Sequence, residues 1–227
     1  MAKAVVTGGG RGIGANIARS LAGDGWDVVV TARTREQIDA VAQEIGGTAI
    51  VMDAADPASI KHAFEEIGTL DFLAANAGTA TGTLEQVIAV NVFGVARCVE
   101  EALERNVQRI VITGSGSSYL PGSSDLAYGP SKAAVGRYAE NLNNAVDIPV
   151  FVFSPGLVQT EMTSSFPRDL PWTPPELAPE LVRKLATGKY DALAGRYIHA
   201  EHDDIDDLLA RADEIRENDL NSIRLRR

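Results

Sequence analysis

Short apolar runs rich in Val and Ile alternate with longer stretches in which apolar residues recur at helical spacing. Most of the short runs are continuously apolar, which is typical of strands buried on both faces of a sheet. The runs that predict strands are Lys3–Thr7, Asp27–Thr31, Thr48–Met52, Phe72–Ala75, Arg109–Thr113, Pro149–Phe153 and Arg196–His199.

The stretches between these runs have the periodicity of amphipathic helices. The predicted helices are Gly12–Ala22, Arg35–Ile45, Pro57–Ile67, Leu84–Arg105, Leu126–Asn144, Pro175–Leu185 and a final acidic one, Asp203–Glu217. Repeated alternation of strand and helix predicts an α/β fold, a doubly wound parallel sheet of about seven strands flanked by helices. No internal repeat or long linker interrupts the pattern, so we expect a single domain over residues 1–227.

Composition and charge narrow the possible partners and compartment. Hydrophobic residues make up 45% and charged residues 23% of the 227 residues, as in ordinary globular proteins. The formal net charge of −10 argues against a nucleic-acid-binding surface. No apolar run approaches the roughly 20 residues of a membrane span, and because a strand is predicted from residue 3 we expect no signal peptide. The single cysteine, Cys98, excludes an internal disulfide, is expected in the core, and fits a cytoplasmic location.

A glycine-rich segment connects the first predicted strand to the first predicted helix. Its sequence is Thr7-Gly8-Gly9-Gly10-Arg11-Gly12-Ile13-Gly14. Glycines let the backbone turn tightly and approach a diphosphate, and the helix that follows presents its N-terminal amides to the anion. A plain glycine-rich turn would have the same composition, but the position between strand and helix favours a dinucleotide site. Three residues separate the first two framework glycines, unlike the usual Gly-x-Gly-x-x-Gly spacing.

Tyr128 and Lys132 are four residues apart in a predicted helix, so their side chains lie on one face. A free phenol has a pKa of about 10. A neighbouring ammonium favours the phenolate and is expected to lower this pKa, which would make the pair a general acid/base. The spacing alone is weak evidence, because it also occurs by chance on solvated helices.

These motifs and their order resemble the short-chain dehydrogenase/reductase family over most of residues 3–160. The resemblance includes Thr-Gly-x-x-x-Gly-x-Gly near the N-terminus, Tyr-x-x-x-Lys in the middle, and four further segments. Those segments are Ala75-Asn76-Ala77-Gly78, Val90-Asn91-Val92, Ser115 after the fifth strand, and Ser154-Pro155-Gly156-Leu157-Val158-Gln159-Thr160. The resemblance implies a Rossmann-like fold and the interconversion of alcohols and carbonyl compounds with NAD or NADP.

The resemblance also assigns roles to single residues. The catalytic serine of the family typically lies thirteen residues before the tyrosine, which indicates Ser115, with Ser117 second. Its hydroxyl would hold the substrate carbonyl near Tyr128. The neighbouring serines, Ser118, Ser123 and Ser124, are expected to be solvent-facing turn residues. Lys132 would also hold the nicotinamide ribose, and Asn91 would support a water that leads protons to Lys132, although a buried helical Asn can be purely structural.

The cofactor-binding residues are assigned from the glycine-rich segment and the matched motifs. They are Thr7, Gly8, Gly9, Gly10, Arg11, Gly12, Ile13, Gly14, Arg33, Thr34, Asp53, Ala54, Asn76, Ala77, Gly78, Tyr128, Lys132, Pro155, Gly156, Val158 and Thr160.

The end of the second strand indicates which cofactor is preferred. NAD enzymes usually place Asp or Glu there to bind the adenosine ribose, whereas this chain has Ala32 followed by Arg33. A guanidinium binds a 2′-phosphate through charge-assisted hydrogen bonds, and Arg11 would add a second positive charge. We therefore expect NADP(H), the alternative being two ordinary surface arginines. Asp53 resembles the acid that binds adenine in the family, but it could instead cap the turn into the next helix.

The chain departs from the family in three places. The stretch from Gly78 to Asn91 is short, which leaves open the substrate pocket and the form of a possible homo-oligomer, dimer or tetramer. A proline-rich segment around 160–180 predicts a substrate lid. Its apolar residues could line the substrate site or pack the loop onto the body; they are Met162, Phe166, Leu170 and Trp172. The family's C-terminal strand ending in Asp-Gly-Gly is absent, and in its place are Gly195-Arg196-Tyr197-Ile198-His199 and a variant acidic helix around 203–218.

Two other clusters do not change this interpretation. Acids and histidines near residue 200 could suggest a metal site, but a strand end and a helix start rich in acids explain them better; they are His199, Glu201, His202, Asp203 and Asp204. The basic tail, residues 224–227, is too short to indicate nucleic acid.

The leading hypothesis is an NADPH-dependent carbonyl reductase with a small-molecule substrate and no nucleic-acid or membrane partner. A non-catalytic NADP-sensing regulator, and a lyase or isomerase on the same fold, remain alternatives.

Overall fold

All seven predicted strands form one parallel sheet. The computed structural model describes residues 1–121 and 125–224. Ser123 and Ser124, and all of the basic tail except Arg224, lie outside the described residues. The strands are β1 Lys3–Thr7, β2 Asp27–Ala32, β3 Thr48–Val51, β4 Phe72–Ala75, β5 Arg109–Thr113, β6 Val150–Ser154 and β7 Tyr197–His199. Their order across the sheet is β3-β2-β1-β4-β5-β6-β7.

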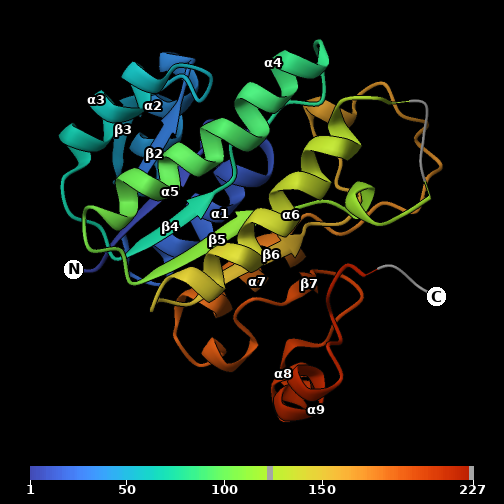
Figure 1. Ribbon diagram of the computed structural model, residues 1–227. Coiled ribbons are helices and arrows are strands. Elements are labelled where there is room, and N and C mark those ends of the chain that lie inside the picture. The colour runs from blue at the N-terminus through green and yellow to red at the C-terminus, as the bar shows by residue number, and fades with distance from the viewer. Residues whose placement is uncertain (122–124, 225–227) are drawn as a thin grey trace.

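Helices cover both faces of this sheet (Figure 1). They are α1 Gly12–Gly23, α2 Arg35–Ile45, α3 Pro57–Ile67, α4 Leu84–Ile88, α5 Val95–Leu103, α6 Tyr128–Ala145, α7 Leu177–Ala186, α8 Ile205–Ala210 and α9 Ala212–Glu217. The predicted fold class, a doubly wound parallel sheet between helices, is confirmed.

Two apolar cores lie on opposite faces of the sheet, because successive strand residues point to opposite sides. Val6 packs in a core with α1, α2 and α7, whereas its neighbour Val5 packs in a core with α3, α5 and α6. Both valines are fully buried. Continuously apolar strands in the sequence therefore correspond to strands covered on both sides.

The helix predicted over Leu84–Arg105 has a different form. It consists of α4, a π-helical segment Ala89–Gly94, and α5, which ends at Leu103. A Cβ on Gly94 would lie 2.2 Å from the carbonyl oxygen of Ala54, so the widened segment passes directly against the loop after β3. Apolar periodicity does not distinguish this segment from an α-helix, because the residues on either side follow the same pattern.

The acidic helix predicted over Asp203–Glu217 is divided into α8 and α9. Asp204 caps α8 by accepting hydrogen bonds from the amides of Asp206 and Asp207. The chain leaves helical geometry at Arg211, where φ is −108° and ψ is 18°. Smaller corrections move the ends of four strands and of α1, α6 and α7 by one or two residues.

The order of the strands places one crevice at the centre of the sheet. From β1, the strands β2 and β3 extend the sheet on one side, and β4 and the later strands extend it on the other, so the strand order reverses between β1 and β4. Ligands of such sheets bind at that point, outside the carboxyl ends of the strands. The glycine-rich segment after β1 and the segment after β4 meet there. Within the described residues, no helix is long and apolar enough to cross a membrane.

Candidate active site

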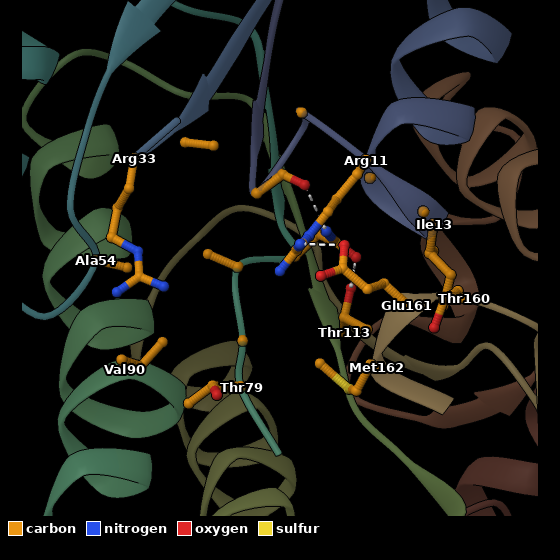
Figure 2. A pocket seen from close by; sticks show the side chains of 18 of the residues that line it. Arg11, Ile13, Arg33, Ala54, Thr79, Val90, Thr113, Thr160, Glu161 and Met162 are labelled. Carbon is orange, nitrogen blue, oxygen red and sulfur yellow. Dashed lines mark hydrogen bonds and ion pairs between the residues drawn. The ribbon is translucent and has the colours of Figure 1, made fainter. Parts of the chain in front are cut away.

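A cavity of about 770 Å³ opens at the carboxyl ends of the central strands (Figure 2). It brings together most of the residues assigned from the sequence. Those that line it are Gly8, Gly10, Arg11, Gly12, Ile13, Gly14, Arg33, Thr34, Asp53, Ala54, Asn76, Ala77, Gly78, Tyr128, Lys132, Pro155 and Thr160.

Four other residues of the cofactor-binding set lie behind the cavity wall. Thr7 Oγ1 accepts hydrogen bonds from the backbone N–H groups of Asn76 and Ala77, both at 3.0 Å, and so ties the β1 loop to the β4 loop. Gly9 packs against Val30. Gly156 has a φ of +81° and leaves room for Thr173, and Val158 is buried. These residues shape the loops that line the cavity.

The glycine-rich loop fits a diphosphate. Gly12, at the start of α1, has a φ of +55°, a left-handed conformation that favours glycine. A Cβ on Gly14 would lie 2.2 Å from the carbonyl oxygen of Gly8, so this turn accepts no side chain there. The first turn of α1 contains no acidic residue, so its N-terminal amides and dipole present positive charge to the cavity.

Two arginines approach the cavity from opposite sides (Figure 2). Arg11 forms an ion pair with Glu161, which also lines the cavity. Arg33 forms no ion pair with any residue in the described ranges, and its guanidinium points into the cavity. Arg33 is therefore the cation that is available to a bound phosphate, whereas the charge of Arg11 is shared with a carboxylate.

Asp53 lines the cavity after β3 and also closes the local turn. Its Oδ1 accepts a hydrogen bond from the Ala55 amide at 2.9 Å. The cap of α3 itself is Asp56, whose side chain accepts from the Ala58 amide. The structure is thus compatible with either role considered for Asp53, turn former or adenine ligand.

Lys132 is buried on α6 and is held against β5. Its Nζ donates a hydrogen bond to the Thr113 carbonyl at 2.7 Å and lies 5.8 Å from the centre of the Tyr128 ring. The two side chains share a face of the helix, as their spacing predicts. Burial lowers the pKa of Lys132 to about 8, because little around it compensates the desolvated ammonium.

The pKa of Tyr128 is raised, which is the opposite of the lowering expected from its lysine neighbour. Burial is the main cause, and the charge of Asp125 adds to it, whereas a hydrogen bond with the Ser115 side chain opposes it. Desolvation of the buried phenol has the largest effect, and the Lys132 ammonium donates its hydrogen bond to the Thr113 carbonyl and not to Tyr128. Tyr128 is consequently a neutral phenol near pH 7, the form that gives up a proton.

Asn91 lies in the π-helical segment and is fully buried. Its side chain accepts a hydrogen bond from the Thr79 amide at 2.8 Å and donates to the Thr79 carbonyl and to Ser131 Oγ, each at 2.9 Å. A Cβ on Gly78 would lie 3.3 Å from Asn91 Oδ1 and 3.7 Å from Lys132 Nζ, so the three residues adjoin one another. Asn91 itself does not line the cavity; it fixes the loop that does.

Ser115 follows β5 beside the cavity and is partly buried. Its Oγ accepts a hydrogen bond from the Ser117 amide at 3.2 Å, and the side chain also bonds Tyr128. Ser117 is exposed, and its Oγ lies 3.3 Å from that of Ser115. Of the two candidate serines, Ser115 is the one that interacts with Tyr128.

The predicted lid contributes one apolar side chain to the cavity. Met162 lines the cavity, whereas Phe166, Leu170 and Trp172 do not. Trp172 instead donates its indole N–H to the Arg168 carbonyl at 3.0 Å, a contact within the loop itself. Met162 thus takes the first of the two roles considered for these side chains, whereas Phe166 is exposed and neither apolar core includes Phe166, Leu170 or Trp172.

Several lining residues were not found from the sequence. They are Gln37, Met52, Ala55, Thr79, Thr81, Gln86, Ala89, Val90, Thr113, Gly114 and Glu161. Most are small or apolar residues outside any motif, and only their neighbours in sequence indicated the region. Glu161 had a signal, since it directly follows Thr160 at the start of the expected lid.

The acids and histidines near residue 200 make contacts within the cluster and with neighbouring segments, such as the hydrogen bond that Glu201 accepts from Thr173. The rings of His199 and His202 stack with their centres 4.1 Å apart, and Asp203 accepts a hydrogen bond from the His199 amide. Among the described residues, no group of three or more His, Cys, Asp or Glu side chains is arranged to hold a metal ion.

The comparisons with known proteins agree on one family. The family model of short chain dehydrogenases matches residues 2–171. The chain is 30% identical over 188 residues to 3-oxoacyl-(acyl-carrier-protein) reductase FabG of Escherichia coli, a match that covers 73% of this chain and 77% of that protein. It is 30% identical over 185 residues to carbonyl reductase family member 4 of Xenopus laevis, covering 72% and 78%.

A solved structure shows the same architecture. The Pseudomonas aeruginosa RhlG/NADP active-site complex superposes with a TM-score of 0.81 at 28% identity, covering 87% of this chain and 94% of that one.

Proposed function

The chain belongs to the short-chain dehydrogenase/reductase family, a family of oxidoreductases, and on that premise we propose that it interconverts a carbonyl compound and an alcohol with NADP(H). The observation that carries the proposal is the position of Tyr128 and Lys132 in the wall of a cavity that fits a dinucleotide. The proton donor and the anion-binding loop thus share one enclosed space.

Different residues of this chain bind the cofactor, orient the carbonyl group and transfer the proton. The glycine-rich loop and the start of α1 bind the diphosphate. When bound, the reduced nicotinamide supplies the hydride that reaches the carbonyl carbon. Ser115 donates a hydrogen bond to the carbonyl oxygen and Tyr128 gives that oxygen a proton. Lys132 binds the ribose hydroxyls, and its positive charge stabilises the phenolate that remains when Tyr128 has given up its proton.

The neutral state of Tyr128 supports reduction as the favoured direction near pH 7. Because burial raises its pKa, the phenol holds its proton until an acceptor with developing negative charge is present. The ammonium of Lys132 then stabilises the phenolate that forms. Oxidation of an alcohol requires the phenolate beforehand and should become more favourable as pH rises.

The preference for NADP(H) rests on Arg33. Its unpaired guanidinium points into the cavity after β2, where the sequence has Ala32 in place of an acid. A 2′-phosphate would gain charge-assisted hydrogen bonds there without displacing another anion. Arg11 would contribute to binding of the 2′-phosphate only when its ion pair with Glu161 is broken.

The test is NADPH oxidation in the presence of ketones, quinones, oxidised sugars and steroids, with Tyr128→Phe as the comparison. We expect at least one carbonyl to be reduced, and Tyr128→Phe to lower kcat by about 10² or more while NADPH still binds, since the variant lacks the proton donor. Fluorescence titration with NADPH measures the binding.

Two outcomes would favour the alternatives. Tight NADPH binding without oxidation by any compound would indicate the regulator, and conversion of a compound without net loss of NADPH would indicate a lyase or isomerase. An unchanged kcat in Tyr128→Phe would exclude Tyr128 as the acid.

A further inference from the structure

Tyr197, on the C-terminal strand β7, binds both polar backbone groups of Ser115. Its hydroxyl accepts a hydrogen bond from the Ser115 amide at 2.8 Å and donates one to the Ser115 carbonyl at 2.6 Å. Ser115 is extended, with φ −167° and ψ 149°, so its N–H and C=O point to the same side and one hydroxyl reaches both. The two residues are 82 positions apart in the chain.

The phenol of Tyr197 keeps both hydrogen-bonding functions over the working pH range. Burial raises its pKa to about 12, although hydrogen bonds from Ser118 and the Ser115 backbone oppose the shift. A neutral phenol donates once and accepts, which is what the two Ser115 groups require. Ser118 Oγ also donates to the Ser115 carbonyl at 2.6 Å, so the serine backbone is held from two sides.

The surrounding chain leaves space for this hydroxyl. A Cβ on Gly114 would lie 2.9 Å from the Tyr197 oxygen, so a side chain there would displace it. On the other side, a Cβ on Gly136 of α6 would lie 3.9 Å from the Tyr197 ring. The ring of Tyr119 packs edge-on against the Tyr197 ring with centres 5.4 Å apart. Tyr197 is 9% exposed and is therefore fixed by packing as well as by hydrogen bonds.

The C-terminal segment in turn holds Tyr197. The Tyr197 amide donates to the Asn221 carbonyl at 2.7 Å, and Asn221 Nδ2 donates to the Tyr197 carbonyl at 3.1 Å. Arg196 is bound to Asp219 at 2.8 Å. Within the described residues, nothing after residue 162 lines the cavity. The C-terminal segment nevertheless reaches the site through Tyr197.

We infer that Tyr197 is a positioning residue, which fixes the Ser115 backbone so that Ser115 Oγ is aimed at Tyr128 and the substrate carbonyl. The inference rests on the proposed function, because it assumes that Ser115 acts in catalysis. The loop that it steadies, Gly114-Ser115-Gly116-Ser117-Ser118, consists only of Gly and Ser and has little side-chain bulk to fix itself. Misplacement of a catalytic group by about 1 Å costs on the order of 10²-fold in rate.

The test compares Tyr197→Phe with Tyr190→Phe. Tyr190 is also buried and donates its hydroxyl to Asp206 at 2.9 Å, so its substitution removes the same atom from the core on the opposite face of the sheet. With a carbonyl that the wild type reduces, Tyr197→Phe should lower kcat about 10- to 100-fold and leave the Kd of NADPH within about twofold. Tyr190→Phe should leave kcat within about twofold.

A double-mutant cycle separates positioning from a general loss of structure. If Tyr197 acts through Ser115, then Tyr197→Phe should have little further effect on kcat in a Ser115→Ala background. Losses that multiply in the double variant, or an unchanged kcat in Tyr197→Phe, would overturn the inference. An unchanged kcat in Ser115→Ala alone would instead refute the proposed role of Ser115, so the two failures are distinguishable.

Hydrogen exchange tests the contact itself and needs no substrate. The amides of residues 114–118 should exchange faster in Tyr197→Phe than in Tyr190→Phe or the wild type, while those of residues 8–14 should stay unchanged. Asn221→Ala, which removes one hydrogen bond to Tyr197, should give a smaller effect of the same kind if Tyr197→Phe folds poorly. Equal exchange of residues 114–118 in all the variants would contradict the inference.

Discussion

At the scale of single residues, Arg11 and Arg33 have the same chemistry but different surroundings. Arg11 is bound to Glu161, 150 residues later in the chain, whereas Arg33 forms no ion pair within residues 1–121 and 125–224. A phosphate near Arg11 must compete with a carboxylate, and one near Arg33 need not. The selectivity for NADP(H) should therefore depend mainly on Arg33.

Replacing Arg33 with Ala should weaken NADPH binding about 10- to 100-fold and leave NADH binding nearly unchanged, because only the 2′-phosphate is lost as a partner. Fluorescence titration of both reduced cofactors measures the two constants. Arg35→Ala is the matched control, since Arg35 is exposed, pairs with Asp39 at 3.6 Å and does not line the cavity. Equal weakening of both cofactors would rule out phosphate recognition by Arg33.

The sequence allowed most of the lining residues to be predicted, because the glycine-rich loop and the Tyr-x-x-x-Lys spacing are local patterns. The role of Tyr197 and the ion pair of Glu161 with Arg11 could not be predicted in this way, since the partners lie 82 and 150 residues apart. The direction in which the pKa of Tyr128 is shifted was also predicted wrongly. It depends mainly on burial of the phenol, which only the packed structure determines.

At the scale of elements, the π-helical segment Ala89–Gly94 connects two sides of the cavity. Asn91 holds the Thr79 loop from this segment, and Gly94 lies against the carbonyl of Ala54, another lining residue. The sequence predicted a continuous helix here and could not indicate the π turn, because apolar periodicity reports which face is buried and not which carbonyl each amide bonds.

Gly94→Ala should lower the free energy of unfolding by about 1–3 kcal/mol, because the new Cβ would clash with the Ala54 carbonyl. It should also weaken NADPH binding, since Ala54 must move. Gly23→Ala in α1 is the control. A Cβ there meets nothing within 4 Å, so this variant should be stabilised by about 0.5–1 kcal/mol. Urea denaturation measures both; a stabilised Gly94→Ala would contradict the close approach.

At the scale of the whole molecule, a buried ammonium makes the stability depend on pH. The pKa of Lys132 is about 8 in the folded protein, against 10.5 for an ordinary lysine. Between these values the unfolded chain binds a proton that the folded chain lacks, so stability increases as pH rises through this range. Below pH 8 the ammonium is charged in both states and its burial is destabilising.

The free energy of unfolding of the wild type, relative to Lys132→Met, should therefore rise by about 3 kcal/mol between pH 8 and 10.5. Urea denaturation of both proteins at several pH values, without cofactor, measures the difference. Other groups that titrate in this range are common to both proteins and cancel. A difference that is constant with pH would show that the Lys132 pKa is not lowered.

The overall topology was predictable because each strand is apolar on both faces and each connection is a helix, a combination that favours a doubly wound parallel sheet. The position of the last elements was not. Arg211 interrupts an unbroken helical pattern, and the contact of Asn221 with β7 joins residues 24 positions apart through the backbone of Tyr197, which carries no sequence signal.

The hydrogen bond between Tyr197 and Asn221 also has a consequence for the order of assembly during synthesis. The residues that line the cavity lie between positions 8 and 162, and the ribosome produces all of them before Tyr197 and Asn221. Synthesis of the cavity-lining residues is thus finished before the anchor of the Ser115 loop exists. If Tyr197 positions Ser115 as inferred, catalytic competence requires the last part of the chain, although no described residue of that part lines the cavity.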